Sequence, residues 1–313
     1  LFTRSCLRND KRREVLPMDL TVFIRQLVNG IQVGSIYALV ALGYTMVYGI
    51  VKLINFAHGD FIMVGGYVAV FTIPFLAQHG MPTWLCIFAA VAVCCAIGVL
   101  TEKIAYKPLR GAPSLSVLIT AIAVSLCLQN LALIFFSSAP RPMSSVFDLP
   151  PLVLGEIQFS GVSIITILLS VCLMVALQLF IKNTRMGKAM RAVSEDGQAA
   201  VLMGISTNRT ISLTFAIGSG LAAVAAVMYC SAYPQVQPYM GSMLGLKAFI
   251  AAVLGGIGSI PGAMLGGILI GLVENMTRHF NSQLADVVVF SILIIVLLVK
   301  PTGIMGKNVG EKV

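Results

Sequence analysis

The stretch AVLGGIGSIPGAMLGG, residues 252–267, lies inside a long apolar block and carries six glycines and one proline. In a water-exposed helix, glycine costs about 1 kcal/mol and proline about 3 kcal/mol relative to alanine. In hydrocarbon, a broken helix is tolerated only where protein or a water-filled cavity satisfies the freed backbone groups. We therefore expect the turn GSIPG at 258–262 to pack against protein or to line a path.

The glycines of this region recur at intervals that suit close helix packing. Gly258, Gly262 and Gly266 are four residues apart, as are Gly267 and Gly271, and small residues at this spacing let membrane helices approach closely. Two interpretations stay open. The glycines serve packing alone, or they mark a broken helix at a translocation route, as in transporters built from internal repeats.

The composition of the whole chain indicates a membrane protein. Of its 313 residues, 58% are hydrophobic and 11% are charged, whereas soluble domains are about a quarter charged. The net charge of +9 is spread over short segments between apolar blocks, as the positive-inside rule expects and unlike a nucleic-acid-binding surface. The predicted fold class is all-α, a polytopic integral membrane helical bundle.

A spanning helix needs about 20 apolar residues. The sequence contains eight apolar blocks, at 20–50, 61–77, 84–106, 114–136, 162–184, 211–231, 244–277 and 286–299. The blocks 20–50 and 244–277 are too long for one simple crossing and contain glycines near their middle. We expect each to be a pair of short or broken helices, which gives about ten membrane segments; eight simple spans remain the alternative.

The basic residues predict the orientation and the domain boundaries. The loops 103–113 and 182–209 are both basic, so both are expected in the cytoplasm. With ten segments, both termini are then cytoplasmic as well. We interpret residues 1–17 as a basic tail or as translated upstream sequence, and residues 18–313 as a single transmembrane domain.

The sequence shows no motif for chemistry on this chain. The phosphate-binding pattern G-x-x-x-x-G-K-[ST] is absent, so ATP is not expected to bind here. The seven cysteines form no CxxC pair, the three histidines are far apart, and no nucleophile–base arrangement is visible. Asp60, Glu102, Glu274 and Asp286 fall near block ends, and the expected lack of central carboxylates disfavours an ion-coupled carrier. We predict a non-catalytic chain without metal or cofactor.

The segment RMGKAMRAVSEDGQAAVLMGIST, residues 185–207, is predicted to be a cytoplasmic helix that docks on a partner. Ser194 and Asp196 are candidate N-caps, and Gly204 can end the helix. An interfacial helix lying on anionic lipid is the alternative. The candidate coupling residues within the segment 185–210 are Arg191, Ser194, Glu195, Asp196, Ala199, Ala200 and Gly204.

Polar and glycine residues inside the blocks are candidates for the translocation path. Small polar residues in such helices more often hydrogen-bond a neighbouring helix, for about 0.6 kcal/mol each, so helix packing is the alternative. The outer loop 232–243 is uncharged, which suits a neutral or zwitterionic solute. The candidates for path or packing are Asn29, Ser35, Tyr48, Asn55, Gly258, Pro261, Gly262 and Gly266.

Three stretches resemble a known family. They are NGIQVGSIYALVALGYTMVYGIVKLINFAHGD (29–60), RMGKAMRAVSEDGQAAVLMGI (185–205) and KAFIAAVLGGIGSIPGAMLGG (247–267). Together they resemble the LivH-type permease of bacterial branched-chain amino acid ABC importers. The resemblance runs from about residue 18 to residue 313.

The resemblance implies a multi-pass permease of the bacterial inner membrane that moves leucine, isoleucine or valine. Its partners would be a second, LivM-like permease, two LivG- and LivF-like ATPases that bind ATP and Mg, and a periplasmic amino-acid binding protein. No nucleic acid is implied. The alternatives are an ion-coupled carrier, a passive channel for a small neutral solute, or the same importer type with another amino acid, urea or an amide as substrate.

Overall fold

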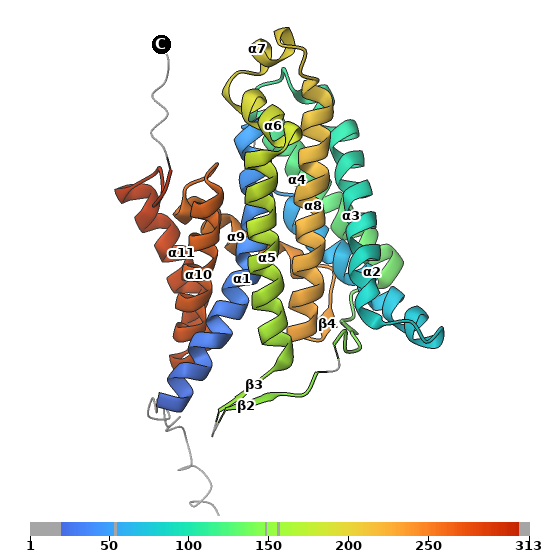
Figure 1. Cartoon of the computed structure of the whole chain (residues 1–313), viewed down its shortest axis with the longest axis vertical. Helices are drawn as coiled ribbons and strands as arrows, with labels where there is room; N and C mark the ends of the chain where they lie inside the picture. Colours follow the sequence, from blue (N-terminus) through green and yellow to red (C-terminus); the bar gives the residue numbers. More distant parts are fainter. Residues whose placement is uncertain (1–19, 53–54, 148, 155–156, 307–313) are drawn as a thin grey trace, which may run out of the picture.

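A computed structural model describes residues 20–52, 55–147, 149–154 and 157–306, and helices dominate them (Figure 1). Eight helices are long and apolar enough to cross a membrane, so the predicted all-α membrane bundle is confirmed. They are α1 (Leu20–Val51), α2 (His58–Gln78), α3 (Cys86–Thr101) with its continuation to Leu109, α4 (Ser114–Phe136), α5 (Gly161–Asn183), α8 (Thr207–Ala232), α10 (Ile260–Phe280) and α11 (Ser282–Val299).

Shorter elements connect these helices. Two antiparallel pairs are formed by β1 (Arg141–Pro142) with β4 (Gln235–Val236), and by β2 (Leu152–Leu154) with β3 (Ile157–Phe159). The remaining helices are α6 (Arg185–Glu195), α7 (Gly197–Leu202), α9 (Met240–Gly255), and the single turns η1 (Thr83–Leu85), η2 (Glu102–Tyr106) and η3 (Lys107–Leu109).

The two long apolar blocks behave differently. Block 244–277 is broken as expected, into α9 and α10. Block 20–50 is one continuous helix of 32 residues, so the expected break there is wrong. The described residues therefore hold eight long apolar helices and the short α9, not ten segments. At 1.5 Å per residue, α1 is about 48 Å long and exceeds the hydrocarbon thickness of about 30 Å.

The break between α9 and α10 is stabilised by the C-terminal part of the chain. The backbone N–H groups of Ile304 and Met305 donate to the carbonyls of Leu254 and Gly255, at 2.8 and 3.0 Å. These carbonyls end α9 and have no partner within a helix. The protein itself thus satisfies the backbone groups that the break frees, as the sequence led us to expect.

The backbone conformation of the turn explains why the stretch 252–267 contains glycine and proline. Gly256 and Gly258 have φ angles of 103° and 93°, which side chains of L-residues rarely permit. Ser259 caps α10, because its Oγ accepts the Gly262 N–H at 3.2 Å. Pro261 occupies the first turn of α10, where its missing N–H has no cost.

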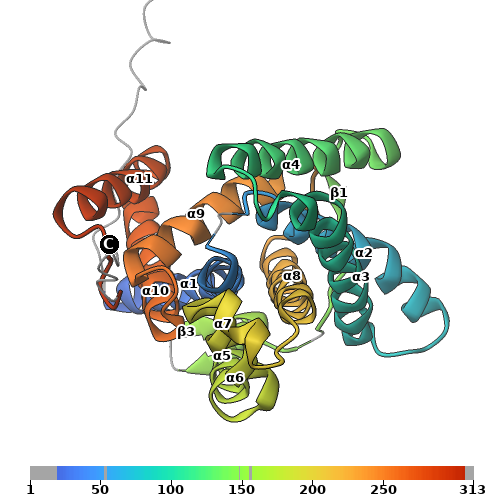
Figure 2. The same ribbon diagram turned by 90° about the horizontal axis from the view of Figure 1, so that it is seen from above.

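Helices α1 and α8 form the centre of the bundle. Most of each helix is buried, whereas α3, α4, α5 and α11 present most of their residues at the surface. Figure 2 shows α1 and α8 surrounded by the other helices. Exposed apolar side chains on the outer helices, such as Leu168 on α5 and Ile134 on α4, suit contact with lipid.

Helix α10 touches α1 backbone to backbone. Gly267 packs on Ala38, and Gly271 packs on Gly34 and Gly30. On its other side, Gly262 and Gly266 face Gly255 and Ala251 of α9. The four-residue glycine spacing therefore serves two helix contacts.

We expect Gly34→Ala to destabilise the bundle. A Cβ at Gly34 would lie 2.8 Å from Ile268 Cα and 2.9 Å from the Gly267 carbonyl oxygen, and overpacking of this kind costs about 1–3 kcal/mol. Gly49→Ala on the same helix is the matched control, because its Cβ would meet only Gly258 Cα at 3.8 Å. Thermal unfolding of the purified protein should show a lower midpoint for the first variant alone. Equal midpoints would show that the α1–α10 contact can relax at no cost.

Different secondary-structure elements lie at the two ends of the bundle. Figure 1 shows α6 and α7 at one end, with the end of α11, and β2, β3 and the start of α1 at the opposite end. An unbroken α1 thus begins opposite to the coupling segment. The tail 1–17 and the C-terminal residues 307–313 lie outside the described residues.

Candidate functional site

The coupling segment 185–210 forms two short helices at one end of the bundle (Figure 1). Thr184 caps α6 by accepting the Gly187 N–H at 3.0 Å. Asp196 caps α7 by accepting the N–H groups of Gln198 and Ala199, at 2.9 and 3.0 Å. The prediction for Asp196 is confirmed, whereas Ser194 lies within α6 and its hydroxyl donates to a backbone carbonyl of the same helix.

Helix α7 exposes an apolar edge to solvent. The side chains of Leu202 and Met203 are 88% and 82% exposed, and Val201 is exposed too. Ala200 is 4% exposed and faces the bundle, unlike the exposed Ala199. Gly204, with φ of 78°, follows α7 as expected. The exposed Arg191 and Glu195 lie on α6 at the same end of the bundle.

The candidates for the translocation path are not brought to one place. Asn29 and Tyr48 are half-buried on α1, and Ser35 is buried among its neighbours. Asn55 is buried and its Oδ1 accepts the Tyr106 hydroxyl at 2.6 Å. Gly258 belongs to the turn before α10, and Pro261 lies in the first turn of α10. Of these residues, Tyr48 lines a pocket.

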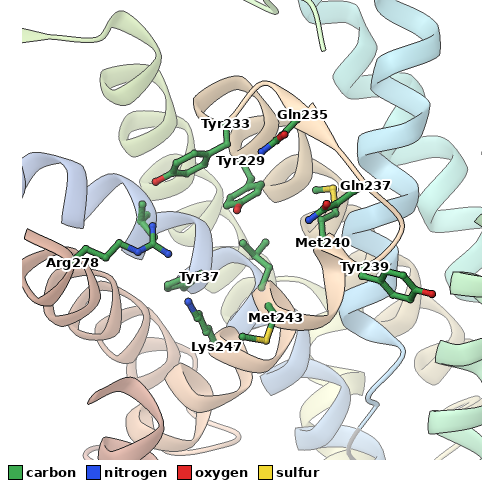
Figure 3. A pocket seen from close by; sticks show the side chains of 12 residues that line it. Tyr37, Tyr229, Tyr233, Gln235, Gln237, Tyr239, Met240, Met243, Lys247 and Arg278 are labelled. Carbon is green, nitrogen blue, oxygen red and sulfur yellow. The ribbon is translucent and has the colours of Figure 1, made fainter. Parts of the chain in front are cut away.

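A pocket of about 190 Å³, which we call the outer pocket, is shown in Figure 3. It lies near β4, which Figure 1 shows toward the end of the bundle opposite to α6 and α7. Helix α1 contributes Val33 and Tyr37, and α10 contributes Arg278. The end of α8 and the segment leading through α9 supply the other lining residues, which are Tyr229, Tyr233, Gln235, Gln237, Tyr239, Met240, Met243, Leu244 and Lys247.

A cluster of charges, which we call the ion cluster, lies beside this pocket. It consists of Lys247 on α9, Glu274 and Arg278 on α10, and Asp286 on α11. Lys247 Nζ lies 2.7 Å from Glu274 Oε1 and 2.6 Å from Asp286 Oδ1, and Arg278 Nη2 lies 2.5 Å from Glu274 Oε1. The hydroxyl of Tyr37 donates to Glu274 Oε2 at 2.6 Å. The cluster joins three helices, and Tyr37 connects it to a fourth, α1.

The four carboxylates lie toward helix ends, as the sequence indicates, and three of them are also buried between helices. Asp60, Glu102 and Glu274 are each at most 1% exposed. Each has partners: Asp60 accepts from Gln129, and Glu102 accepts from Ser212 and Arg110. A position near the end of an apolar block did not keep these groups at the surface, because neighbouring helices cover the block ends.

A second, smaller pocket lies between α1 and α9, lined by Tyr44, Tyr48, Phe249, Ala252 and Ile257. Along α1 it follows the outer pocket, since Val33 and Tyr37 line the first and Tyr44 and Tyr48 line the second. The rings of Tyr44 and Phe249 are 5.9 Å apart. Aromatic side chains thus form part of the wall of the second pocket.

The sequence did not predict the two charged residues that line the outer pocket. Lys247 and Arg278 line the pocket, and neither is among the site residues predicted from the sequence. A cation at the start of one apolar helix and a carboxylate within the next is a signal for a buried pair. Its pairing requires the hairpin geometry of α9 and α10.

Residues 26–297 match the family described as branched-chain amino acid transport system, permease component. The chain belongs to this family. It is therefore a transport subunit of the multi-pass membrane type, without catalytic function, and the resemblance seen in the three sequence stretches is confirmed.

Individual relatives agree over most of the length. The chain is 45% identical to the high-affinity branched-chain amino acid transport system permease protein LivH of Escherichia coli (strain K12), and 46% identical to BraD of Pseudomonas aeruginosa, which carries the same description. Each comparison covers 93% of this chain and 98% of the relative. The fructose import permease protein FruF of Bifidobacterium longum is 26% identical over 87% of this chain and 76% of its own.

Proposed function

We propose that this permease moves leucine, isoleucine and valine across a bacterial inner membrane as part of an ATP-driven importer. The observation that supports this choice of substrate is the 45–46% identity, over almost the whole chain, to LivH and BraD. FruF, named for a sugar, is far less similar. The similarity to LivH and BraD, both named for branched-chain amino acid transport, therefore favours branched-chain amino acids over the other solutes.

Energy is proposed to come from partner chains. The sequence lacks the pattern that cradles ATP phosphates, so ATP and Mg would bind to two LivG- and LivF-like ATPases. The exposed apolar edge of α7, formed by Val201, Leu202 and Met203, suits burial in a groove of such a partner. A LivM-like permease would complete the passage, and a periplasmic binding protein would deliver the substrate.

We place the α6–α7 end of the bundle in the cytoplasm. Arg185, Lys188 and Arg191 lie there, and the second basic loop is at the same end, since Arg110 hydrogen-bonds Asn208 at the start of α8. Excess positive charge marks the cytoplasmic side. The outer pocket then opens toward the periplasm, α1 begins on the periplasmic side, and α11 ends on the cytoplasmic side. The chain ends themselves, which the sequence predicts to be cytoplasmic, lie outside the described residues.

A direct mechanical link connects the docking edge to the outer pocket. Helix α7 leads through a short turn into α8, and the far end of α8 carries Tyr229 and Tyr233, which line the pocket. A pull on α7 by closing ATPases would therefore tilt the wall of the pocket. Separation of Tyr44 from Phe249 would open the way to the smaller inner pocket, and access would alternate.

The proposal predicts ATP-dependent uptake by the assembled importer. Vesicles containing this chain, its partner permease and both ATPases should accumulate labelled leucine when the loaded binding protein is outside and ATP inside. Unlabelled isoleucine and valine should compete, whereas fructose and urea should not. Uptake should survive an uncoupler while ATP is held constant; uptake that collapses with the ion gradient would contradict the proposal.

A further inference from the structure

The wall of the outer pocket carries two cations and, among the described residues that line it, no carboxylate. Lys247 reaches it from α9 and Arg278 from α10, and Figure 3 shows both side chains directed toward the cavity. The Lys247 side chain is 6% exposed, and that of Arg278 is 40% exposed. A pocket with this lining favours an anionic group.

The matching carboxylates lie behind the cations. Glu274 is 1% exposed, and its two oxygens already accept from Lys247, Arg278 and Tyr37. Three donors thus surround Glu274, and its burial keeps it from contact with a ligand in the pocket. With Asp286 included, the ion cluster has two positive and two negative charges. The cations are therefore held in place without a ligand.

Both cations retain capacity for a ligand carboxylate. Arg278 has five N–H donors, and its pair with Glu274 uses one end of the guanidinium. The second partner of Lys247 is Asp286, whose side chain is 45% exposed. Water can take over the contacts of such a half-exposed carboxylate, so Lys247 can exchange Asp286 for a ligand at low cost. Two converging cations suit the two oxygens of one carboxylate.

The rest of the pocket matches the remainder of an aliphatic amino acid. Neutral acceptors for an ammonium group come from tyrosine hydroxyls and glutamine amides: Tyr229, Tyr233, Gln235 and Gln237. Apolar contact surface comes from Val33, Met240, Met243 and Leu244. Methionines adapt their shape to different aliphatic side chains.

We infer that the outer pocket is a binding site for the translocated amino acid, with its carboxylate on Lys247 and Arg278 and its aliphatic side chain on Met240, Met243 and Leu244. The identity of the ligand rests on the function proposed above. This lining favours an aliphatic zwitterion over two other kinds of solute. A neutral solute offers no carboxylate to the two cations, and a basic side chain brings a further positive charge to a wall lined by cations.

The first test replaces the more exposed cation in the complete importer. Arg278→Gln leaves Glu274 paired with Lys247, and we expect leucine uptake into vesicles to fall about tenfold or more, the loss of one hydrogen bond to a charged group. ATP hydrolysis stimulated by the loaded binding protein should stay within about twofold, because α7 is at the other end of the bundle. Uptake at the wild-type rate would overturn the inference.

Arg141→Gln is the matched control. Arg141 lies on β1 at the same end of the bundle, over the Phe71 ring, and does not line the pocket. We expect this variant to keep uptake within about twofold of wild type. An equal loss in both variants would mean that removing a cation outside the pocket has the same effect, and would overturn the specific role of Arg278.

A second test does not depend on the stability of the Arg278 variant. Met243→Cys places a thiol in the pocket wall, to be labelled with a methanethiosulfonate reagent from the periplasmic side of the complex. Millimolar leucine should slow the labelling several-fold, and leucinamide, which lacks the carboxylate, should not. The unchanged chain reports labelling of the native cysteines. Equal protection by both compounds, or none by either, would overturn the inference.

The two proposals fail separately. If the wild-type complex transports another solute and not leucine, the proposed function is wrong. If the wild-type complex transports leucine and the Arg278→Gln complex does so equally well, the function stands and the site is wrong.

Discussion

Leu202→Glu is expected to abolish transport while leaving the permease folded. Leu202 is 88% exposed on α7, so a charge there is solvated in the isolated chain. In a groove of an ATPase, the same position would lose about 1.5–3 kcal/mol of apolar burial and would add the cost of a buried, unpaired carboxylate. A total loss of about 3 kcal/mol or more weakens docking by about two orders of magnitude.

Copurification of the ATPases with the tagged permease, together with leucine uptake, measures this effect. Gln198→Glu is the control, because Gln198 is exposed near the start of the same helix, where a negative charge suits the helix dipole. Ala200→Glu should fail differently: Ala200 is 4% exposed, so that charge enters the permease itself and lowers the yield of folded protein. Normal assembly and uptake by the Leu202→Glu importer would refute docking through this edge.

The membrane bundle was predictable because contact with lipid requires a continuous run of apolar residues, which is visible in the local sequence. A run of apolar residues identifies a span whatever its neighbours are. Glycines were ambiguous, however, since close packing and helix breaks both use them. Only the break before α10 also has Ser259 as a cap and Pro261 in the first turn. Helix α1 contains glycines but neither signal, and its Gly30 and Gly34 pack against α10 instead.

Local sequence signals also identified parts of the coupling segment, whereas features that depend on tertiary packing could not be predicted. Asp196 and Gly204 act on the backbone within a few residues, so their roles as cap and terminator followed from the sequence. Whether Ala200 or Leu202 faces a partner depends on how α7 lies against the bundle. Likewise, the pairing of Lys247 with Glu274 requires two helices to fold back on each other, so the position of the carboxylate near a block end does not predict it.

The largest loss of stability is expected for Glu274→Gln. The substitution keeps the shape of the side chain but leaves Lys247 and Arg278 facing each other, with Asp286 as the remaining counter-charge in the ion cluster. Breaking a buried pair by removing one partner costs about 3–5 kcal/mol, because the other charge stays buried without compensation. At roughly 2 °C per kcal/mol for a chain of this size, the midpoint of thermal unfolding should fall by about 6–10 °C.

Asp286→Asn is the matched control, since it removes the other carboxylate bound to Lys247. Asp286 is 45% exposed, and a pair of this kind contributes about 1 kcal/mol or less, so the midpoint should move by about 2 °C or less. Adding Lys247→Met to Glu274→Gln should recover part of the lost stability, because the double variant no longer buries a lysine whose remaining partner is the half-exposed Asp286. A double variant less stable than Glu274→Gln alone would show that Lys247 stabilises the helices by packing rather than by charge, and would contradict the ion cluster as the tie between α9 and α10.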